Sequence, residues 1–193
     1  LTANSVYGQL GAKTSSISFK KVAACTTAIG RDRIYDAERL VMDWARVNKK
    51  LPPEVVYGDT DSIFVKFNRR DKGQLCKDKE ALAYCIQCGK DAGEYITEHL
   101  HKEGKAPQDL EYEKTFWPFI LISKKRYTGD KYEFSADEIP KRISMGLVTK
   151  RRDNAPIVKY VFGNLINKFM YDRDLNKTLE WLKSMLKRII NGK

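Results

Sequence analysis

The chain has 193 residues, with 36 Lys and Arg against 25 Asp and Glu, a net charge of +11 and a mean hydropathy of −0.53. A hydrophobic fraction of 42% supplies one ordinary core and excludes wholesale disorder. No run of roughly 18 apolar residues is present, so we expect no membrane-spanning segment and no membrane partner. With four cysteines and no secretory leader, the chain is expected to be intracellular with reduced thiols.

The first half of the chain combines long helical patterns with a short β-rich stretch. The apolar spacing predicts a helix from Phe19 to about Val47, with Gly30 as its weak point. Two β-rich runs, at 55–57 and 63–67, lie on either side of an Asp- and Gly-containing turn and predict a hairpin with carboxylates at its tip. A second helix is predicted from about Asp78 to Lys102.

The second half changes to strands and then returns to helices. Three aromatic and β-branched runs predict strands, at 110–122, 126–134 and 142–149. Pro156 fits the first turn of a helix, and the leucines from Leu175 onward form the stripe of a last helix. Helices and strands are mixed without βαβ regularity, which predicts an α+β core over about 1–145 and a helical appendage beyond it.

The positive charge is concentrated in the second half. Residues 114–152 contain ten basic and four acidic residues, a net charge of +6, with aromatic residues such as Trp117 and Tyr132 among the cations. This pattern is typical of a surface that follows a phosphate backbone. A solvated basic face and acidic partners other than nucleic acid are the alternatives.

Asp59 and Asp61 form the most distinctive carboxylate pair. Side chains alternate along a strand, so two aspartates one residue apart are expected to point to the same face. Such a pair is repulsive unless a cation binds, and hard oxygen ligands suit Mg²⁺, which favours phosphoryl transfer. Ordinary turn chemistry is the simpler interpretation.

Two further interpretations of this pair are weaker. A calcium-binding EF-hand loop starting at Asp59 would need Gly at its sixth position, where this chain has Phe64. A phosphatase would use Asp59 as nucleophile and Asp61 as acid, but it normally needs a βαβ context that the sequence lacks. The phosphatase remains a rival hypothesis.

The six residues Tyr57-Gly58-Asp59-Thr60-Asp61-Ser62 resemble motif C of the family B DNA polymerases. Other segments resemble that family in the same order, from motif B to the passage between palm and thumb. They are Asn4-Ser5-Val6-Tyr7-Gly8, Leu110-Glu111-Tyr112-Glu113-Lys114, Lys124-Lys125-Arg126-Tyr127, and Gly146 followed by 150–156. The resemblance runs from Asn4 to about Val158. The residues of these segments are most similar to those of the delta-type polymerases of large nucleocytoplasmic DNA viruses.

The resemblance implies a fold and a division into regions. The fold is an α+β polymerase palm with an antiparallel sheet and long helices, followed by the helical start of a thumb. Residues 1–18 are expected to end the fingers with motif B, 19–145 to form the palm, and 146–193 to form the palm–thumb junction and the first thumb helices.

The resemblance also implies a reaction, in which a primer 3′-hydroxyl attacks the α-phosphate of a deoxynucleotide and pyrophosphate leaves. Asp59 and Asp61 would be catalytic and would bind two Mg²⁺ ions, with Mn²⁺ as an alternative. Glu113 resembles an extra palm carboxylate, and Glu111 and Glu113 would share one face of a strand. An exposed ion pair between Glu113 and a nearby Lys is the alternative. Lys125 resembles the palm lysine that contacts the primer strand.

Substrate-binding residues follow from the same resemblance. Asn4, Tyr7 and Gly8 would line the nascent base pair, with a core aromatic as the alternative for Tyr7. Positions expected to contact DNA are Tyr57, Thr60, Lys124, Arg126, Tyr127, Arg151 and Arg152. The implied partners are primer-template DNA, deoxynucleoside triphosphates, the rest of the polymerase chain and a sliding clamp. The implied location is the host nucleus or a cytoplasmic viral replication site.

The family's first metal-binding motif and its motif B lysine do not occur in these 193 residues. We therefore expect the isolated chain to be inactive as a polymerase, because one carboxylate turn cannot hold both metals. The rival from another class is a non-catalytic basic module that binds nucleic acid, in which the Asp pair serves only the turn.

Overall fold

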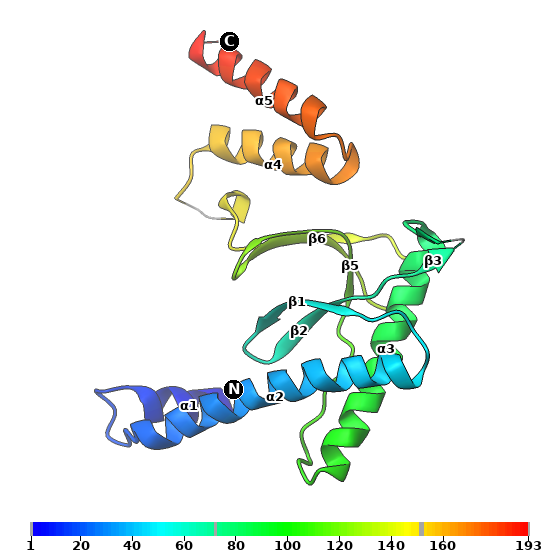
Figure 1. Ribbon diagram of the computed structural model, residues 1–193. Helices are drawn as coiled ribbons and strands as arrows, with labels where there is room; N and C mark the ends of the chain where they lie inside the picture. Colours follow the sequence, from blue (N-terminus) through cyan, green and yellow to red (C-terminus); the bar gives the residue numbers. More distant parts are fainter. Residues whose placement is uncertain (1, 72, 151–152, 193) are drawn as a thin grey trace. The chain divides into compact units, whose positions relative to one another are not determined.

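The computed structural model describes residues 2–71, 73–150 and 153–192. The chain divides into two compact units, Leu1–Tyr112 and Glu113–Lys193, which are described here one at a time. Helices alternate with small antiparallel sheets (Figure 1), which confirms the predicted α+β class. No helix among the described residues has the length and apolar character needed to cross a bilayer.

The first unit contains helices α1 (Thr2–Gly11), α2 (Lys20–Val47) and α3 (Lys79–Lys102). The two long helices confirm the periodicity-based predictions to within a residue at each end. Asp78 caps α3, because its carboxylate accepts a hydrogen bond from the Ala81 N–H at 2.7 Å. Helix α1 was not predicted, because its ten residues include two glycines and carry only a weak apolar stripe.

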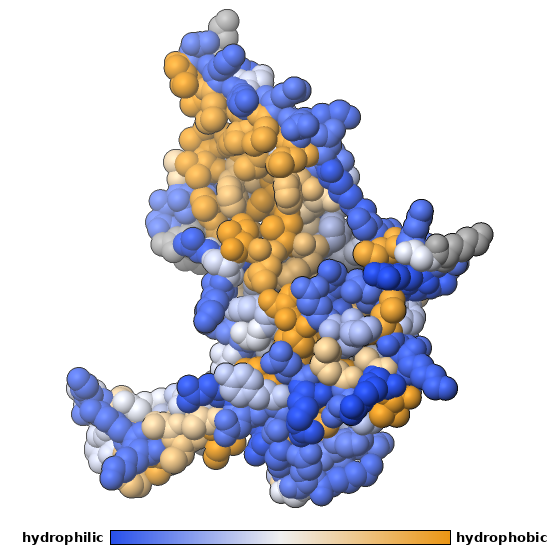
Figure 2. All heavy atoms as spheres, in the orientation of Figure 1, coloured by the Kyte–Doolittle hydropathy of each residue, from blue (hydrophilic) through white to orange (hydrophobic). Residues whose placement is uncertain are grey.

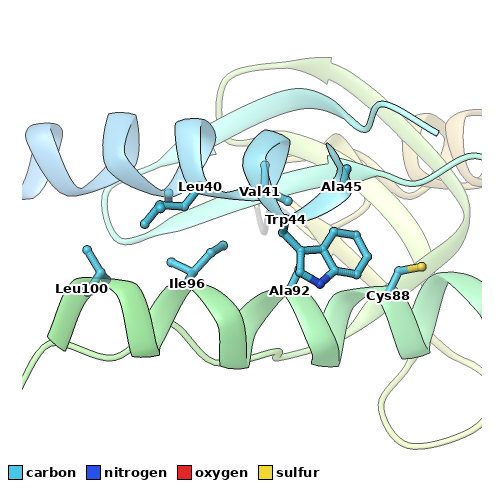
Figure 3. Close-up of a cluster of buried hydrophobic side chains, with 9 residues drawn as sticks. Leu40, Val41, Trp44, Ala45, Cys88, Ala92, Ile96 and Leu100 are labelled. Atoms are coloured by element: carbon cyan, nitrogen blue, oxygen red, sulfur yellow. The ribbon is translucent and has the colours of Figure 1, made fainter. Parts of the chain in front are cut away.

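The core of the first unit lies between α2 and α3. Leu40 and Trp44 on α2 point toward α3, which contributes Ile96 and Leu100 (Figure 3), and Val41 belongs to the same cluster; all five side chains are at most 4% exposed. Burying side chains of this size contributes about 1.5–3 kcal/mol each. The two helices therefore form a packed base for the two strands that directly follow α2.

Strands β1 (Glu54–Asp59) and β2 (Ser62–Lys66) form the predicted antiparallel hairpin. Val55, Ile63 and Val65 pack against the α2–α3 core, which holds one side of the hairpin. A second small hairpin, β3 (Arg70–Asp71) and β4 (Gln74–Leu75), precedes α3.

The second unit is built on the antiparallel sheet β5-β6-β7, with β5 at Thr115–Ser123, β6 at Arg126–Tyr132 and β7 at Lys141–Met145. The prediction that the first strand begins at 110 is wrong. Leu110 hydrogen-bonds through both its N–H and its carbonyl to the Thr97 hydroxyl, at 2.9 and 3.2 Å, so its backbone pairs with a side chain of α3 and not with a strand. Strand β7 ends before the predicted 149, because Gly146 takes a φ of +63° and a short 3₁₀ turn, η1 (Val148–Lys150), follows.

Helices α4 (Pro156–Tyr171) and α5 (Leu175–Ile190) complete the second unit. Ile166 and Met170 of α4 pack with Leu147 and with Ile120 of β5. An apolar patch covers part of the viewed face of both helices (Figure 2). The large apolar side chains of α4 and α5 that are 39–82% exposed are Ile157, Val158, Tyr160, Phe169, Tyr171, Leu175, Leu179, Leu186, Ile189 and Ile190.

A buried carboxylate ties β6 to β7 and α4. The Asp130 side chain is only 7% exposed and lies directly across the sheet from Arg142. Its two oxygens accept hydrogen bonds at 2.5 Å, one from Arg142 Nε and one from the Tyr171 hydroxyl. Arg142 also donates to Asn167 Oδ1 at 2.9 Å and to the Tyr171 oxygen at 2.6 Å. Burial alone lowers the pKa of Arg142, but its bond to Asp130 raises that pKa above its ordinary value, so the pair stays charged.

Candidate functional site

The carboxylate pair lies at the tip of the β1–β2 hairpin. Asp59 ends β1 and pairs with Ser62 at the start of β2, so Thr60 and Asp61 form a two-residue connection. The Asp61 N–H and the Ser62 hydroxyl both donate to the Asp59 carbonyl, at 2.6 and 3.1 Å. The Thr60 hydroxyl donates to Asp59 Oδ1 at 3.3 Å. The turn is therefore held by hydrogen bonds that all converge on Asp59.

Thr60 takes a backbone conformation that does not belong to a strand. Its φ is +54°, and the hydrogen bond from Asp61 to Asp59 closes a three-residue turn of the γ type. Alternation along a strand therefore does not govern Asp61, because the chain leaves strand geometry after Asp59. A positive φ is a genuine outlier for a β-branched residue, and such strain concentrates at functional sites.

The hairpin tip is supported by helix α2. A Cβ on Gly58 would lie 3.4 Å from Ile34 Cγ2, so the strand is in close contact with the helix next to the turn. Tyr57 and Phe64 pair across the strands with their ring centroids 5.2 Å apart. The register shifts between Val55 and Tyr57, a bulge of the kind that often re-aims side chains near active sites.

Asp59 and Asp61 offer a partial ligand set for a metal ion. Asp59 is half-buried and Asp61 is exposed. Within the described ranges no group of three or more His, Cys, Asp or Glu side chains is placed to hold an ion. Two carboxylates supply hard oxygen donors of the type that Mg²⁺ prefers, and Mg²⁺ usually takes only one or two protein carboxylates beside water and phosphate oxygens. The pair therefore fits a Mg²⁺ site that substrate and other groups complete.

The basic turn of the second unit connects β5 to β6. Ser123 pairs with Arg126, and Lys124 and Lys125 form the connection, with Lys125 at a φ of +59°. Lys124, Lys125 and Arg126 are all exposed. Tyr127, also expected to contact DNA, is 7% exposed, and its ring lies 6.1 Å from Phe116 and 5.7 Å from Phe119.

Glu113 also lies in the second unit, before β5 begins. Its side chain is 72% exposed and forms an ion pair with Lys114. The expectation that Glu111 and Glu113 share a strand face is wrong, because β5 starts at Thr115. The ion-pair alternative describes the observed contact.

The positions expected to line the nascent base pair fall on α1. Tyr7 is 43% exposed, so it is not the core aromatic of the alternative interpretation. A Cβ at Gly8 would meet no atom within 4 Å. Asn4 occurs in the same helix. Arg151 and Arg152 lie outside the described residues.

Two features of the second unit were missed by sequence reasoning. The charged pair Asp130 and Arg142 is brought together by the β6–β7 register, which no local pattern reveals. The close approach of Gly146 to the Lys125 carbonyl is also invisible along the chain. A glycine at the end of a predicted strand was the available signal for it, because glycine in a strand pattern often marks a close backbone approach.

Comparisons with known proteins cover the whole chain. A family model described as DNA polymerase family B matches residues 1–192. The chain is 45% identical over 192 residues to a DNA polymerase of Pyramimonas orientalis virus, covering 100% of this chain and 15% of that protein. It is 43% identical over 140 residues to a DNA polymerase of Acanthamoeba polyphaga mimivirus, covering 72% of this chain and 8% of that protein. The DNA polymerase delta catalytic subunit of Candida albicans is 30% identical over 195 residues, covering 100% of this chain and 17% of that subunit.

Proposed function

The chain belongs to DNA polymerase family B, and on this premise we propose that it is part of a template-directed DNA polymerase. The enzyme would add deoxynucleotides to a primer 3′-hydroxyl and release pyrophosphate. The observation that carries the proposal is the strained turn at Thr60, with Asp59 and Asp61 at one hairpin tip beside helix α2. We retain the assignment of 1–18 to the fingers, 19–145 to the palm and 146–193 to the palm–thumb junction and thumb.

Asp59 and Asp61 would hold the divalent metal ions, Mg²⁺ or Mn²⁺. When bound, such an ion supplies positive charge that favours the ionised primer hydroxyl and offsets the charge of the triphosphate. The contribution of the protein is to keep two carboxylates at one place without rearrangement. The hydrogen bonds of Asp61 N–H, the Ser62 hydroxyl and the Thr60 hydroxyl to Asp59 support this role.

The exposed cations Lys124, Lys125 and Arg126 would bind the phosphates of primer-template DNA. Contacts of this kind depend strongly on salt and carry no sequence preference, as a replicative enzyme needs. The buried ring of Tyr127 would support the strand β6 that follows these cations. The direct contact with DNA would then come from Lys124, Lys125 and Arg126. Arg151 and Arg152 are proposed to extend the same contact.

On the substrate side, Asn4, Tyr7 and Gly8 would line the nucleotide pocket, and the exposure of Tyr7 is compatible with that role. Tyr57 and Thr60 would lie near the primer terminus. Glu113 is proposed as the extra palm carboxylate close to the metal ions, where the cations would replace Lys114 as its partner.

The remaining partners follow from the extent of the match. The chain spans about 15% of the length of its viral relative, so the activity belongs to a longer protein. The exposed apolar side chains of α4 and α5 (Figure 2) support contacts with the rest of that polymerase chain. A sliding clamp and an intracellular site, nuclear or cytoplasmic, complete the proposal. The isolated chain is expected to be inactive, because one carboxylate turn cannot hold both metal ions.

The test is Asp61→Asn in the complete polymerase, with Asp71→Asn on the exposed β3 strand as a matched control. Primer extension in Mg²⁺ should fall by about 100-fold or more in the Asp61 variant, while affinity for primer-template DNA stays within about twofold. The control should keep both properties. Unchanged extension by Asp61→Asn would overturn the proposal and favour the non-catalytic binding module. Template-independent phosphate-ester hydrolysis lost in Asp59→Asn would favour the phosphatase.

A further inference from the structure

The end of β7 touches the basic turn between β5 and β6. Gly146 follows β7 with a φ of +63°. A Cβ built on it would lie 2.1 Å from the carbonyl oxygen of Lys125, and 3.2 Å from both the Lys125 carbonyl carbon and Arg126 Cγ. Real Cβ contacts essentially never fall below 3.0 Å, so the two backbones approach more closely than any side chain permits.

The carbonyl of Lys125 cannot move away without moving the turn. Arg126 pairs with Ser123 on one side, and Tyr127 pairs with Met145 on the other, so the backbone beside the contact is fixed by two strands. Lys125 itself has a φ of +59°. That dihedral angle sets the direction in which the Lys125 side chain leaves the turn, because φ fixes the Cα–Cβ bond relative to the preceding peptide.

We propose that Gly146 is a positioning residue for the basic turn Lys124-Lys125-Arg126. Its missing side chain lets the turn settle against the end of β7, and this fixes where Lys125 presents its charge to a DNA phosphate. The inference rests on the proposed function, specifically on the DNA-binding role of Lys125. A Cβ at 146 would have to gain at least 0.9 Å from the Lys125 oxygen to reach 3.0 Å. Displacements of about 1 Å remote from the chemistry are enough to impair positioning severely.

The test compares Gly146→Ala, Lys125→Ala and the double variant in the complete polymerase. The matched control is Gly163→Ala in α4, where a Cβ would make an ordinary 3.8 Å contact with Thr149 Cγ2. Affinity for a fluorescent primer-template duplex is measured from 50 to 300 mM KCl, beside the thermal unfolding of each variant.

Lys125→Ala and Gly146→Ala should each weaken binding by about tenfold and reduce the salt slope by about 1. The double variant should bind within about twofold of Lys125→Ala, because Gly146 acts through the same side chain. Gly163→Ala should keep the affinity and salt slope of the unaltered enzyme. A merely structural role for Gly146 would lower the unfolding temperature and leave the salt slope unchanged.

A second variant covers the case in which Gly146→Ala does not fold. One glycine inserted between Lys124 and Lys125 keeps all three cations and Gly146 but moves the turn carbonyl, and exposed surface loops tolerate insertions. It should lose affinity as Lys125→Ala does.

The outcomes separate the two proposals. An unaffected Lys125→Ala variant refutes the DNA-binding role of Lys125 and the inference with it. If Lys125→Ala weakens binding while the Gly146→Ala effect is absent or fully additive, or if the insertion binds normally, the inference is overturned and the proposed function stands.

Discussion

Replacing Arg142 by Met should loosen α4 from the sheet of the second unit. The methionine keeps an unbranched apolar stem but removes the guanidinium that binds Asp130. The Asp130 carboxylate would then stay buried, at 7% side-chain exposure, with the Tyr171 hydroxyl as the neutral donor that remains of the network. A buried carboxylate that loses its cationic partner is destabilising, because its desolvation is no longer offset.

The magnitude follows from the contacts that are lost. The bond from Arg142 Nε to Asp130, at 2.5 Å, is charge-assisted and partly buried, and such bonds contribute about 1.5–3 kcal/mol. The two more exposed bonds from Arg142, to Asn167 and to Tyr171, add about 0.5 kcal/mol each. Together they give a loss of about 3 kcal/mol, which corresponds to roughly a 100-fold change in a local opening equilibrium.

Amide hydrogen exchange in the complete polymerase measures that opening directly. Peptides from α4 should lose roughly 100-fold in protection in Arg142→Met, whereas peptides from the α2–α3 core should be unchanged. Lys141→Met removes the same charge from the neighbouring, exposed position of β7 and should change protection by less than about threefold. An Arg142→Met variant that behaves like Lys141→Met would refute the reasoning, because Asp130 would then not depend on the guanidinium.

Two further predictions concern the first unit. Asp36 accepts hydrogen bonds from Lys105 and Arg33. Partial burial raises the pKa of the Asp36 carboxyl, but these two bonds outweigh burial and hold that pKa below its ordinary 3.8. The stabilisation is complete above pH 3.8 and is lost as the pH falls through the lowered pKa. Asp36→Asn should therefore reduce amide exchange protection around 99–106 at pH 6, and reduce it progressively less at pH 3 and below. A loss of protection that grows on acidification would contradict this. Gly30→Ala should raise the protection of α2 amides by about two- to fivefold, because a Cβ there meets no atom within 4 Å and glycine costs a helix about 0.5–1 kcal/mol. A fall in α2 protection would mean that the glycine serves a contact outside this chain.

The long elements were predictable because their periodicity extends over many residues. Helix α2 has 28 residues and α3 has 24, so the apolar stripes that pack in the core recur often enough to define both ends. Helix α1 has only ten residues, two of them glycines, so its apolar stripe is too short to define its ends. The prediction of a strand at 110 was wrong for another reason. Its alternation resembled a strand, yet Leu110 is fixed by Thr97 of α3, a partner chosen by tertiary packing.

At the hairpin tip, the turn was predictable and its internal geometry was not. The residues from Tyr57 to Ser62 indicated a turn with two carboxylates, and the register Asp59–Ser62 confirms that turn. The period-two argument assumed strand geometry through Asp61, but the chain turns at Thr60 with a φ of +54°. A β-branched residue adopts such a φ only where its surroundings compensate for a cost of about 1–3 kcal/mol.

Those surroundings come from distant parts of the chain. Gly58 can lie against Ile34 only after α2 has formed, and the inner side of the hairpin is held by side chains of the α2–α3 core. The strained turn is thus stabilised by contacts made some 25 residues earlier and later in the sequence, and a local pattern carries no information about them. The position of the Asp59 and Asp61 carboxylates is therefore a property of the whole first unit, whereas the proposal that they bind metal ions rests on six consecutive residues.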